Sequence, residues 1–431
     1  MILRLSDSIS RGLIVVAALL TALWLSFFAI RSAIAQYGAE GQTLPRLQLA
    51  VRLEPRNPEY WYRLGRYHQY NLEQPDAVTA ESSYREAVEL DPADTFGWLD
   101  LATAYELDGK PEKAREAYVQ AKRSSPISAD VAWRYGNFLL RQGELAQAYP
   151  ELRSAVEADP QRAAEAFSRA YRTNPNIDEL LATVLPAKQS VYVDVIWEAL
   201  SDKQLAVAKT VWARLLLLHP HLEMRDVERF VSELLSAGEY TEARQAWDQG
   251  VATMNLPPLL RPAGSVVWDP SFQTGINGYA FSWQYRPIDQ GVSIDLDKAE
   301  KHSGAQSLRL SFDGKHDPNL EAACTLAIVR PSTTYHLSGW IKSQALTTEQ
   351  GIAFRLHAVD GAFAPPTNTG QVAGTNPWTL VDQRWTAGSD VHRVRICVVR
   401  DASVNPDVRI SGSAWVDDVN LSPEPAEHGK P

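Results

Sequence analysis

Few side chains in this chain of 431 residues stand in patterns that support catalysis. The sequence contains no phosphate-binding loop, no G-x-S-x-G elbow and no H-E-x-x-H zinc motif. His219 and His221 flank Pro220, but no third metal ligand lies near them in the sequence, so we interpret them as part of a solvated loop. We therefore predict no catalytic residue and no enzyme activity. The alternative is a subunit of an enzyme complex with an active site that these motifs do not cover.

Asp417 is the carboxylate that strand patterning singles out. Residues 413–421 alternate as a strand, and Trp415, Asp417 and Val419 share the face that we expect to be buried. A buried carboxylate is costly unless N–H donors or a cation compensate its charge. The residues alone leave both alternatives open.

The chain has two cysteines, Cys324 and Cys397. Strand alternation places Cys324 on the same face as Leu326, toward the core, and Cys397 on the same face as Arg395, away from it. Side chains that point in opposite directions cannot form a disulfide without backbone movement. We therefore predict two unbridged cysteines, although an exported protein would permit a bridge.

An exposed aromatic face is predicted in the last third of the chain. If Leu337 and Ile341 point inward, Trp340 points outward, and a tryptophan beside arginine and histidine is unusual on a surface that meets only water. A pyranose ring can stack on an indole while charged planar groups bond its hydroxyls, so we predict a glycan-binding face. Its residues are Trp340, Arg355, His357 and Arg395, with Trp283 and Tyr285 of a loop closing over the edge. The alternative is that Trp340 packs under a loop or against the helical part of the chain.

The elements that position these residues begin with a repeat. Between residues 95 and 160 one pattern recurs at a spacing of 34, as in Gly109 and Gly143, Ala114 and Ala148, Pro126 and Pro160. The pattern resembles the tetratricopeptide repeat, in which small residues lie where two antiparallel helices touch and a proline closes the second helix. The resemblance covers residues 58–160 and implies a helical solenoid that binds other proteins.

The array continues in degenerate form to residue 255. After Pro160 the signature of the second helix returns only 15 residues later, which indicates either a repeat without its first helix or one long helix. We expect most aromatic residues of the repeats to be wedges between helices. The off-pattern residues Tyr62 and Tyr70 are the ones that could line a concave groove for a peptide.

The N-terminus carries a segment long enough to span a membrane. Gly12 to Ile30 is a run of 19 residues without a charge, about 28 Å long as a helix at roughly 1.5 Å per residue. Two arginines precede it, so the positive-inside bias makes residues 1–36 a cytoplasmic tip and a single-pass anchor in the bacterial inner membrane, with the bulk of the chain in the periplasm. The alternative is a signal peptide cleaved after Ala35.

The helical pattern ends at residues 256–265, where adjacent prolines cannot continue a helix. Period-two strands then occupy residues 266–422 and predict a β-sandwich, and the polar tail 423–431 is expected to be disordered. The fold class is a multidomain α + β chain with a transmembrane helix, an α-solenoid over 37–255 and a terminal β-sandwich.

The formal net charge of −10, with no basic stripe, argues against a nucleic-acid partner.

Five segments of the β part occur together in a characteristic order. They are WDPSF at 268–272, GYAFSWQYRP at 278–287, HSGAQSLRLSF at 302–312, YHLSGWIKS at 335–343 and SAWVDDVNL at 413–421. Together they resemble the galactose-binding-like jelly roll of carbohydrate-binding modules of the families four and nine type. The resemblance implies glycan binding and a structural Ca²⁺ on Asp417, with a glutamate after the opening Phe as another ligand. This chain has Gln273 there, one charge fewer, which puts the Ca²⁺ in doubt.

A membrane anchor, a tetratricopeptide array and such a module together resemble exported bacterial proteins linked to exopolysaccharide or O-antigen assembly. This resemblance implies a non-catalytic scaffold with protein partners on the repeats and polysaccharide on the β domain. The alternative is a purely protein-binding scaffold without a sugar ligand.

Overall fold

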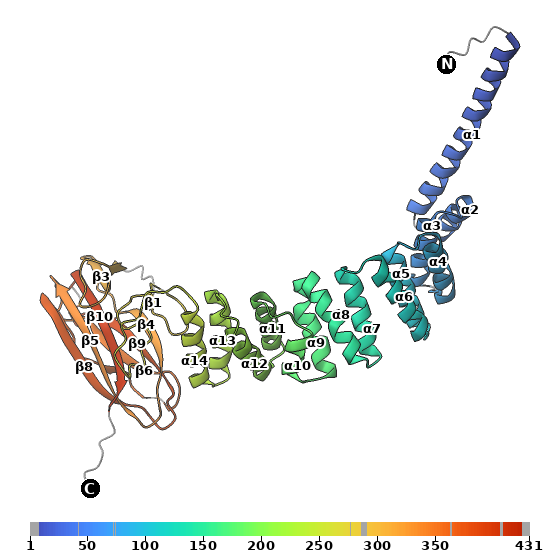
Figure 1. Ribbon diagram of the computed structural model, residues 1–431. Coiled ribbons are helices and arrows are strands. Elements are labelled where there is room, and N and C mark those ends of the chain that lie inside the picture. The colour runs from blue at the N-terminus through green and yellow to red at the C-terminus, as the bar shows by residue number, and fades with distance from the viewer. Residues whose placement is uncertain are drawn as a thin grey trace. The chain divides into compact units, whose positions relative to one another are not determined.

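The computed structural model describes residues 8–41, 43–71, 73, 75–275, 277–285, 291–362, 364–405 and 408–424. The chain divides into two compact units, Met1–Glu198 and Ala199–Pro431. The first unit is helical, and the second consists of helices followed by β-strands (Figure 1).

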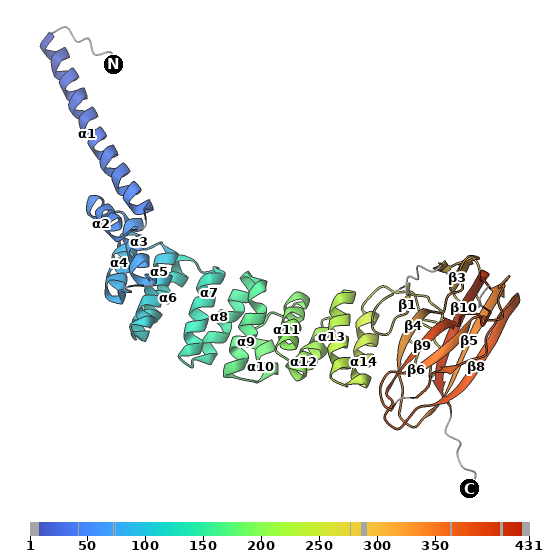
Figure 2. The ribbon, with the colours of Figure 1, turned by 180° about the vertical axis from the view of Figure 1, so that it is seen from behind.

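Helical hairpins make up the first unit. Its helices are α1 (Ser8–Glu40), α2 (Leu44–Leu53), α3 (Pro58–Tyr70), α4 (Ala77–Leu90), α5 (Thr95–Leu107), α6 (Pro111–Ser124), α7 (Ala129–Arg141), α8 (Leu145–Ala158), α9 (Ala163–Thr173) and α10 (Ile177–Thr183), and α11 (Gln189–Ser201) crosses into the second unit. The helices α3 and α4, α5 and α6, and α7 and α8 pack as pairs, as Figures 1 and 2 show from opposite sides. The predicted helical repeat array is confirmed.

Small residues let the paired helices approach closely. A Cβ atom added at Gly65 would lie 2.7 Å from the Tyr84 ring, and one at Gly136 would lie 3.1 Å from Leu152. Tyr84 and Tyr118 are at most 2% exposed, so these rings are wedges between helices, as the repeat pattern predicts.

The repeat geometry changes after α8. A 3₁₀ turn over Pro160–Arg162 separates α8 from α9, and α10 has only 7 residues. The structure therefore contains a shortened helix pair at this point, and no long helix continues from α8. In the second unit the helical part ends with α12 (Leu205–Leu216), α13 (Met224–Ser236) and α14 (Tyr240–Ala252).

Helix α1 is long and apolar enough to cross a membrane, a test that a signal sequence near the N-terminus also passes. Its C-terminal end is part of the helical fold. Ala35 and Ala39 are at most 1% exposed and pack in one cluster with Leu47 and Ala50 of α2. A Cβ atom added at Gly38 would lie 3.0 Å from a backbone oxygen of α2. The alternative cleavage point after Ala35 thus lies within a packed helix pair.

The β part of the second unit is a sandwich of two antiparallel sheets among the described residues. Its strands are β1 (Gln284–Tyr285), β2 (Val292–Asp297), β3 (Ser307–Asp313), β4 (Leu320–Ile328), β5 (Thr334–Gln344), β6 (Ala353–Ala358), β7 (Thr367–Asn368), β8 (Asn376–Thr386), β9 (Arg393–Arg400) and β10 (Ser411–Pro423). One sheet has the order β1-β4-β9-β6-β7 and the other β2-β3-β10-β5-β8. The predicted β-sandwich is confirmed, with β10 running to Pro423. Most of the predicted disordered tail, 425–431, lies outside the described residues.

Strand β10 differs from its predicted alternation. Ala414 and Val416 face the core between the sheets, so Trp415 lies on the outer face. A bulge follows Asp417 and shifts the register with β5. Trp415, Asp417 and Val419 are buried as predicted, but the prediction that they share one face is wrong, because Val419 alone of the three packs in the core between the sheets.

Two polar contacts hold the β part to the last helices of the second unit, beyond the proline-rich residues 256–265. Arg244 of α14 donates to the carbonyl oxygen of Val266 at 2.8 Å. The N–H of Ala280 donates to the carboxylate of Glu228 on α13 at 3.0 Å. The proline-rich segment thus connects two parts that contact each other directly.

Candidate functional site

Two neighbouring pockets, of about 550 Å³ and 430 Å³, lie on the helices of the first unit. Tyr70 lines both of them, so we treat them as one site and call it the repeat groove. The residues of the repeat groove are Leu47, Glu59, Tyr62, Arg63, Arg66, Tyr67, Tyr70, Asn71, Thr103, Glu106, Leu107, Tyr118, Trp133, Arg134, Asn137, Arg141 and Arg169. Most of them come from α3, α5 and α7, the first helices of successive pairs.

Arg66 lies in the first pocket between two tyrosine rings. Its guanidinium carbon is 5.9 Å from the ring centroid of Tyr62 and 5.7 Å from that of Tyr70. At these distances an aromatic face attracts a cation. Among the residues that the structure describes, no carboxylate forms an ion pair with Arg66. The two rings are therefore the contacts that the structure records for the Arg66 guanidinium group.

The carboxylates at the groove already have partners. Asp100 accepts the hydroxyl of Tyr62 at 3.0 Å and pairs with Arg134 at 2.9 Å, and Glu106 pairs with Arg141 at 2.6 Å. Burial, followed by the charge of Asp100, raises the pKa of Tyr62, so its hydroxyl remains a hydrogen-bond donor. These pairs join neighbouring helices and fix the spacing of the groove wall.

Trp133 adds an aromatic face to the second pocket. The guanidinium carbon of Arg169 lies 5.0 Å from its ring centroid, and Arg169 also donates to Asn137 at 2.8 Å. The lining of the whole groove includes five arginines and two glutamates. Four of the arginines pair with carboxylates, since Arg63 also pairs with Glu59 and Arg169 with Glu165, and Arg66 is the fifth. Guanidinium groups bind carboxylates in planar, bidentate geometry. The groove therefore suits an extended segment that carries acidic side chains.

Sequence reasoning identified the two tyrosines of the groove but missed its arginines. Tyr62 and Tyr70 line the groove, as predicted for off-pattern rings. Arg134 and Arg141 lie 34 and 35 residues after Asp100 and Glu106. Opposite charges at the repeat spacing were thus a signal that could have found these two pairs. Arg66 offers no such signal.

The structure divides the predicted glycan-binding face between the two sheets. Trp340 lies on β5, whereas Arg355 and His357 lie on β6 and Arg395 lies on β9. These strands belong to different sheets, and the outer faces of a sandwich point in opposite directions. The four residues therefore do not form one face, and Arg355 already pairs with Asp401 at 2.7 Å.

Trp283 and Tyr285 do not close over Trp340. Trp283 is 1% exposed, stacks on Phe272 and donates to the carbonyl oxygen of Asp269 at 2.7 Å. Tyr285 packs against the core of the sandwich, and burial raises its pKa. The sequence GYAFSWQYRP looked like an exposed loop because its core contacts are with residues distant in the chain.

A loop residue covers Trp340 instead. The ring of His302 lies parallel to the indole of Trp340, with centroids 4.0 Å apart, and Trp378 meets His302 edge-on at 5.7 Å. His302 Nδ1 lies 2.7 Å from an oxygen of Asp418. This arrangement corresponds to the alternative in which Trp340 packs under a loop. Nothing in the spacing of His302 and Trp340 along the chain indicated their contact.

The Asp417 carboxylate is fully buried and accepts three backbone N–H groups. Those of His302 and Ser303 donate to Oδ2 at 2.8 and 2.9 Å, and that of Asp418 donates to Oδ1 at 2.9 Å. Burial, with a smaller contribution from the Asp418 charge, raises the pKa of Asp417 to about 6, although the N–H donors act in the opposite direction. The sequence left open whether N–H donors or a cation compensate the buried charge of Asp417, and the structure has N–H donors there.

Neighbouring side chains extend these contacts. Asp418 accepts the hydroxyls of Ser271 and Ser303. Gln273 accepts the N–H of Ala305 at 2.8 Å and donates its amide to the carbonyl oxygen of Ser271. The opening segment of the β part is thus tied to β10. We call the following residues the Asp417 cluster: Ser271, Gln273, His302, Ser303, Ala305, Asp417 and Asp418.

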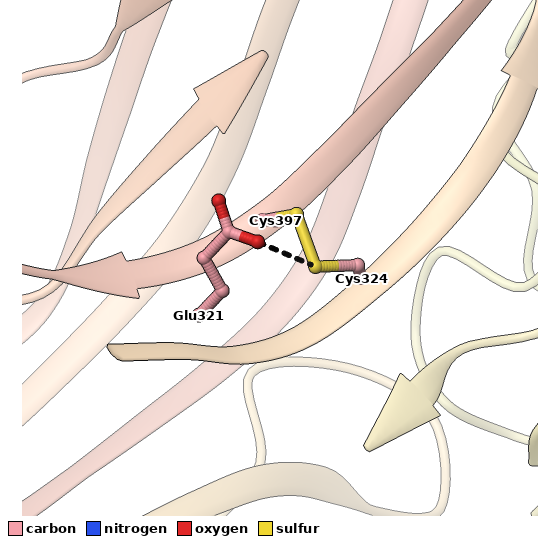
Figure 3. A group of neighbouring side chains, drawn as sticks. All are labelled: Glu321, Cys324 and Cys397. Carbon is pink, nitrogen blue, oxygen red and sulfur yellow. Dashed lines mark hydrogen bonds between the residues drawn. A yellow bond between two sulfur atoms is a disulfide. The ribbon is translucent and has the colours of Figure 1, made fainter. Parts of the chain in front are cut away.

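Glu321, Cys324 and Cys397 form a group whose ligand atoms are close enough to hold a metal (Figure 3). The two cysteines are joined in a disulfide, so the prediction of unbridged cysteines is wrong. They are direct cross-strand neighbours on β4 and β9, and both pack with Ala353 outside the main core. The prediction placed Cys324 toward the core because it shares a strand face with Leu326. That face is the outer one, where Leu326 is only half-buried. A disulfide leaves neither sulfur as a thiolate ligand.

Comparison with known proteins supports the helical assignment. The tetratricopeptide repeat family model matches residues 99–163. This part of the array consists of tetratricopeptide repeats. Over 202 residues the chain is 27% identical to the Type IV pilus assembly protein PilF of Pseudomonas aeruginosa strain PAO1. That match covers 46% of this chain and 66% of the relative, just under two thirds of its length.

Two solved structures are among those to which the chain is similar. A Pseudomonas aeruginosa PilF structure is 14% identical, with a TM-score of 0.26, and the match covers 52% of this chain and 89% of that one. A family 16 carbohydrate-binding module is 18% identical, also with a TM-score of 0.26, covering 36% of this chain and 98% of that one.

Proposed function

We propose that the chain is a non-catalytic, membrane-anchored scaffold whose repeat groove binds an extended acidic segment of a partner protein. The observation that supports this most is Arg66, which the rings of Tyr62 and Tyr70 hold in the groove without a carboxylate partner among the described residues. An incoming carboxylate would complete a charge-assisted pair there. Because the rings already order the guanidinium, little side-chain entropy would be lost on binding.

The proposed location is the bacterial envelope. Helix α1 would span the inner membrane once, with its N-terminus in the cytoplasm and the repeats and β domain in the periplasm. The similarity to a pilus assembly protein supports a role in assembling an envelope structure. Export or assembly of an exopolysaccharide or O-antigen is the process that the domain combination favours.

A binding assay tests the groove. The full chain in detergent is titrated into a fluorescein-labelled peptide of alternating glutamate and leucine, and anisotropy is followed at rising salt concentration. We expect saturable binding that weakens with salt, because the contacts are partly exposed ion pairs. The same peptide with lysine in place of glutamate should bind at least about tenfold more weakly, since Arg66 would repel its lysines and would pair with glutamate instead. Equal binding of the two peptides would reject the proposal.

Glycan binding by the β domain is a second proposed function. The outer face of the sheet β2-β3-β10-β5-β8 carries Trp378, which is half-buried, and Leu380, which is 50% exposed, next to the covered Trp340. An indole edge and an aliphatic side chain together offer an apolar platform for a sugar ring. Titration of the full chain with envelope polysaccharide, followed by tryptophan fluorescence, should give a saturable change that Trp378→Ala abolishes. No change with any polysaccharide would favour the purely protein-binding scaffold.

A further inference from the structure

The Asp417 cluster lies where the resemblance to carbohydrate-binding modules implies Ca²⁺, yet its oxygen atoms are already engaged. A Ca²⁺ ion takes about six to eight oxygen ligands. Both oxygens of Asp417 accept backbone N–H groups, and Asp418 accepts two hydroxyls and contacts His302 Nδ1. Hydrogen-bond donors therefore surround both carboxylates at the positions from which they could coordinate a cation.

Gln273 stands where the resembled modules have a glutamate, and its neighbours fix the orientation of its amide. Oε1 accepts the N–H of Ala305 at 2.8 Å, and Nε2 donates to the carbonyl oxygen of Ser271. If the amide were rotated by half a turn, its NH₂ group would face the N–H of Ala305 and its oxygen would face the carbonyl oxygen of Ser271, and neither contact is a hydrogen bond. The amide oxygen and the carbonyl oxygen of Ser271 are thus both committed to hydrogen bonds, and neither is left as a ligand.

The Gln273 side chain also fills the space between the opening segment and the loop. It is 8% exposed, and a Cβ atom added at Gly304 would lie 2.6 Å from its amide. Gly304 has a φ of 62°, a conformation that favours glycine, and so permits this close approach. The amide therefore occupies the place between Ser271 and Ala305.

We propose that the Asp417 cluster is a metal-free clasp. In it the Gln273 amide and the backbone N–H groups of the loop hold residues 302–305 against β10 without a cation. The clasp positions His302 on Trp340, so the form of the outer face near Trp340 does not depend on Ca²⁺. This inference is independent of the proposed function of the repeat groove.

Hydrogen–deuterium exchange of the full chain in detergent tests the clasp, read on peptides that cover residues 300–306. In the wild-type protein the amides of His302, Ser303 and Ala305 should exchange equally slowly in EDTA and in millimolar CaCl₂, because their acceptors are side chains of this chain. Loss of protection in EDTA that CaCl₂ restores would overturn the proposal. This comparison requires no variant.

Substitutions at Gln273 test the role of its amide. Gln273→Met keeps a similar volume and removes both hydrogen bonds, so exchange at residues 302–305 should rise about tenfold with or without CaCl₂. Gln273→Glu also removes the donor, and its loss of protection should be the same in EDTA and in CaCl₂, because N–H and O–H donors still occupy Asp417 and Asp418. Gln284→Glu, at an exposed position of β1, is the matched charge control and should behave as the wild type. Wild-type protection of both Gln273 variants in EDTA would overturn the role of the amide.

Discussion

The indole of Trp247, in the last helix of the second unit, meets the indole of Trp268 edge-on, with ring centroids 5.1 Å apart. Both side chains are fully buried, and Phe281 completes the contact at 5.9 Å from Trp247. Trp268 belongs to the WDPSF segment that opens the β part. This segment therefore attaches the β part to α14, and its tryptophan is not available to a ligand.

Replacing Trp268 with Ala should destabilise the second unit by ~3–5 kcal/mol, because a buried aromatic side chain is lost and a cavity remains. Since the two tryptophans share one contact, the amides of α14 should lose exchange protection together with those of the β part. Hydrogen exchange of the full chain in detergent measures both at once. Trp378→Ala, on the outer face, is the control. Unchanged protection of α14 in Trp268→Ala would contradict this coupling.

The disulfide should contribute strongly to the stability of the β domain. It joins residues 73 apart in sequence, and closing a loop of that length in the unfolded chain is worth ~4 kcal/mol. Replacing both Cys324 and Cys397 with Ala should lower the free energy of unfolding by that amount. Thiol labelling of the denatured wild-type protein without reductant provides the direct check. Two labelled cysteines would show that the bridge is absent.

Asp417 should make the stability of the β domain depend on pH. Its pKa of about 6 in the folded state exceeds the usual value of about 3.9 in an unfolded chain. The folded state therefore binds the proton more tightly, and the resulting stabilisation is full below pH ~4 and is lost as pH rises through 6. On acidification from pH 7 to 4, the free energy of unfolding of the wild type should rise by up to ~3 kcal/mol relative to that of Asp417→Asn. Urea unfolding of both proteins at the two pH values measures this difference. A wild type that loses stability relative to the variant on acidification would contradict this.

Helix α1 should remain uncleaved. Ala35 and Ala39 pack against α2, and a peptidase needs an accessible, extended segment. We expect membrane-bound protein that retains residues 12–35, as determined by intact mass of the membrane fraction. A reporter fused after Pro431 should be active only if it functions in the periplasm. Recovery of soluble protein that begins at Gln36 would show that residues 1–35 are cleaved as a signal peptide, and would contradict this prediction.

The sequence predicted the parts of the fold that depend on local periodicity. The 34-residue spacing located the repeats because each helix pair buries the same small and large residues, as Gly65 and Tyr84 show. Strand alternation predicted the sandwich. It failed for Cys324 because apolar residues of β4 such as Leu326 lie on the outer face, and for Trp415 because β10 contains a bulge.

The candidate sites were harder to predict because they depend on contacts between distant residues. The stacking of His302 on Trp340 and the separation of Trp340 from Arg355 follow from which strands share a sheet, and single-strand patterns do not contain that information. Tyr62 could be found because it departs from the repeat pattern. Arg66 could not, since its importance comes from its position between two rings.

The most direct test of the central claim is the affinity of Arg66→Ala for the acidic peptide, measured by anisotropy with the full chain in detergent. Losing a charge-assisted pair typically costs ~1.5–3 kcal/mol, so binding should weaken about tenfold or more. Arg85→Ala, an exposed arginine on α4, is the matched control and should bind as the wild type does. Equal affinity of Arg66→Ala and the wild type would contradict the proposal that the repeat groove binds acidic segments.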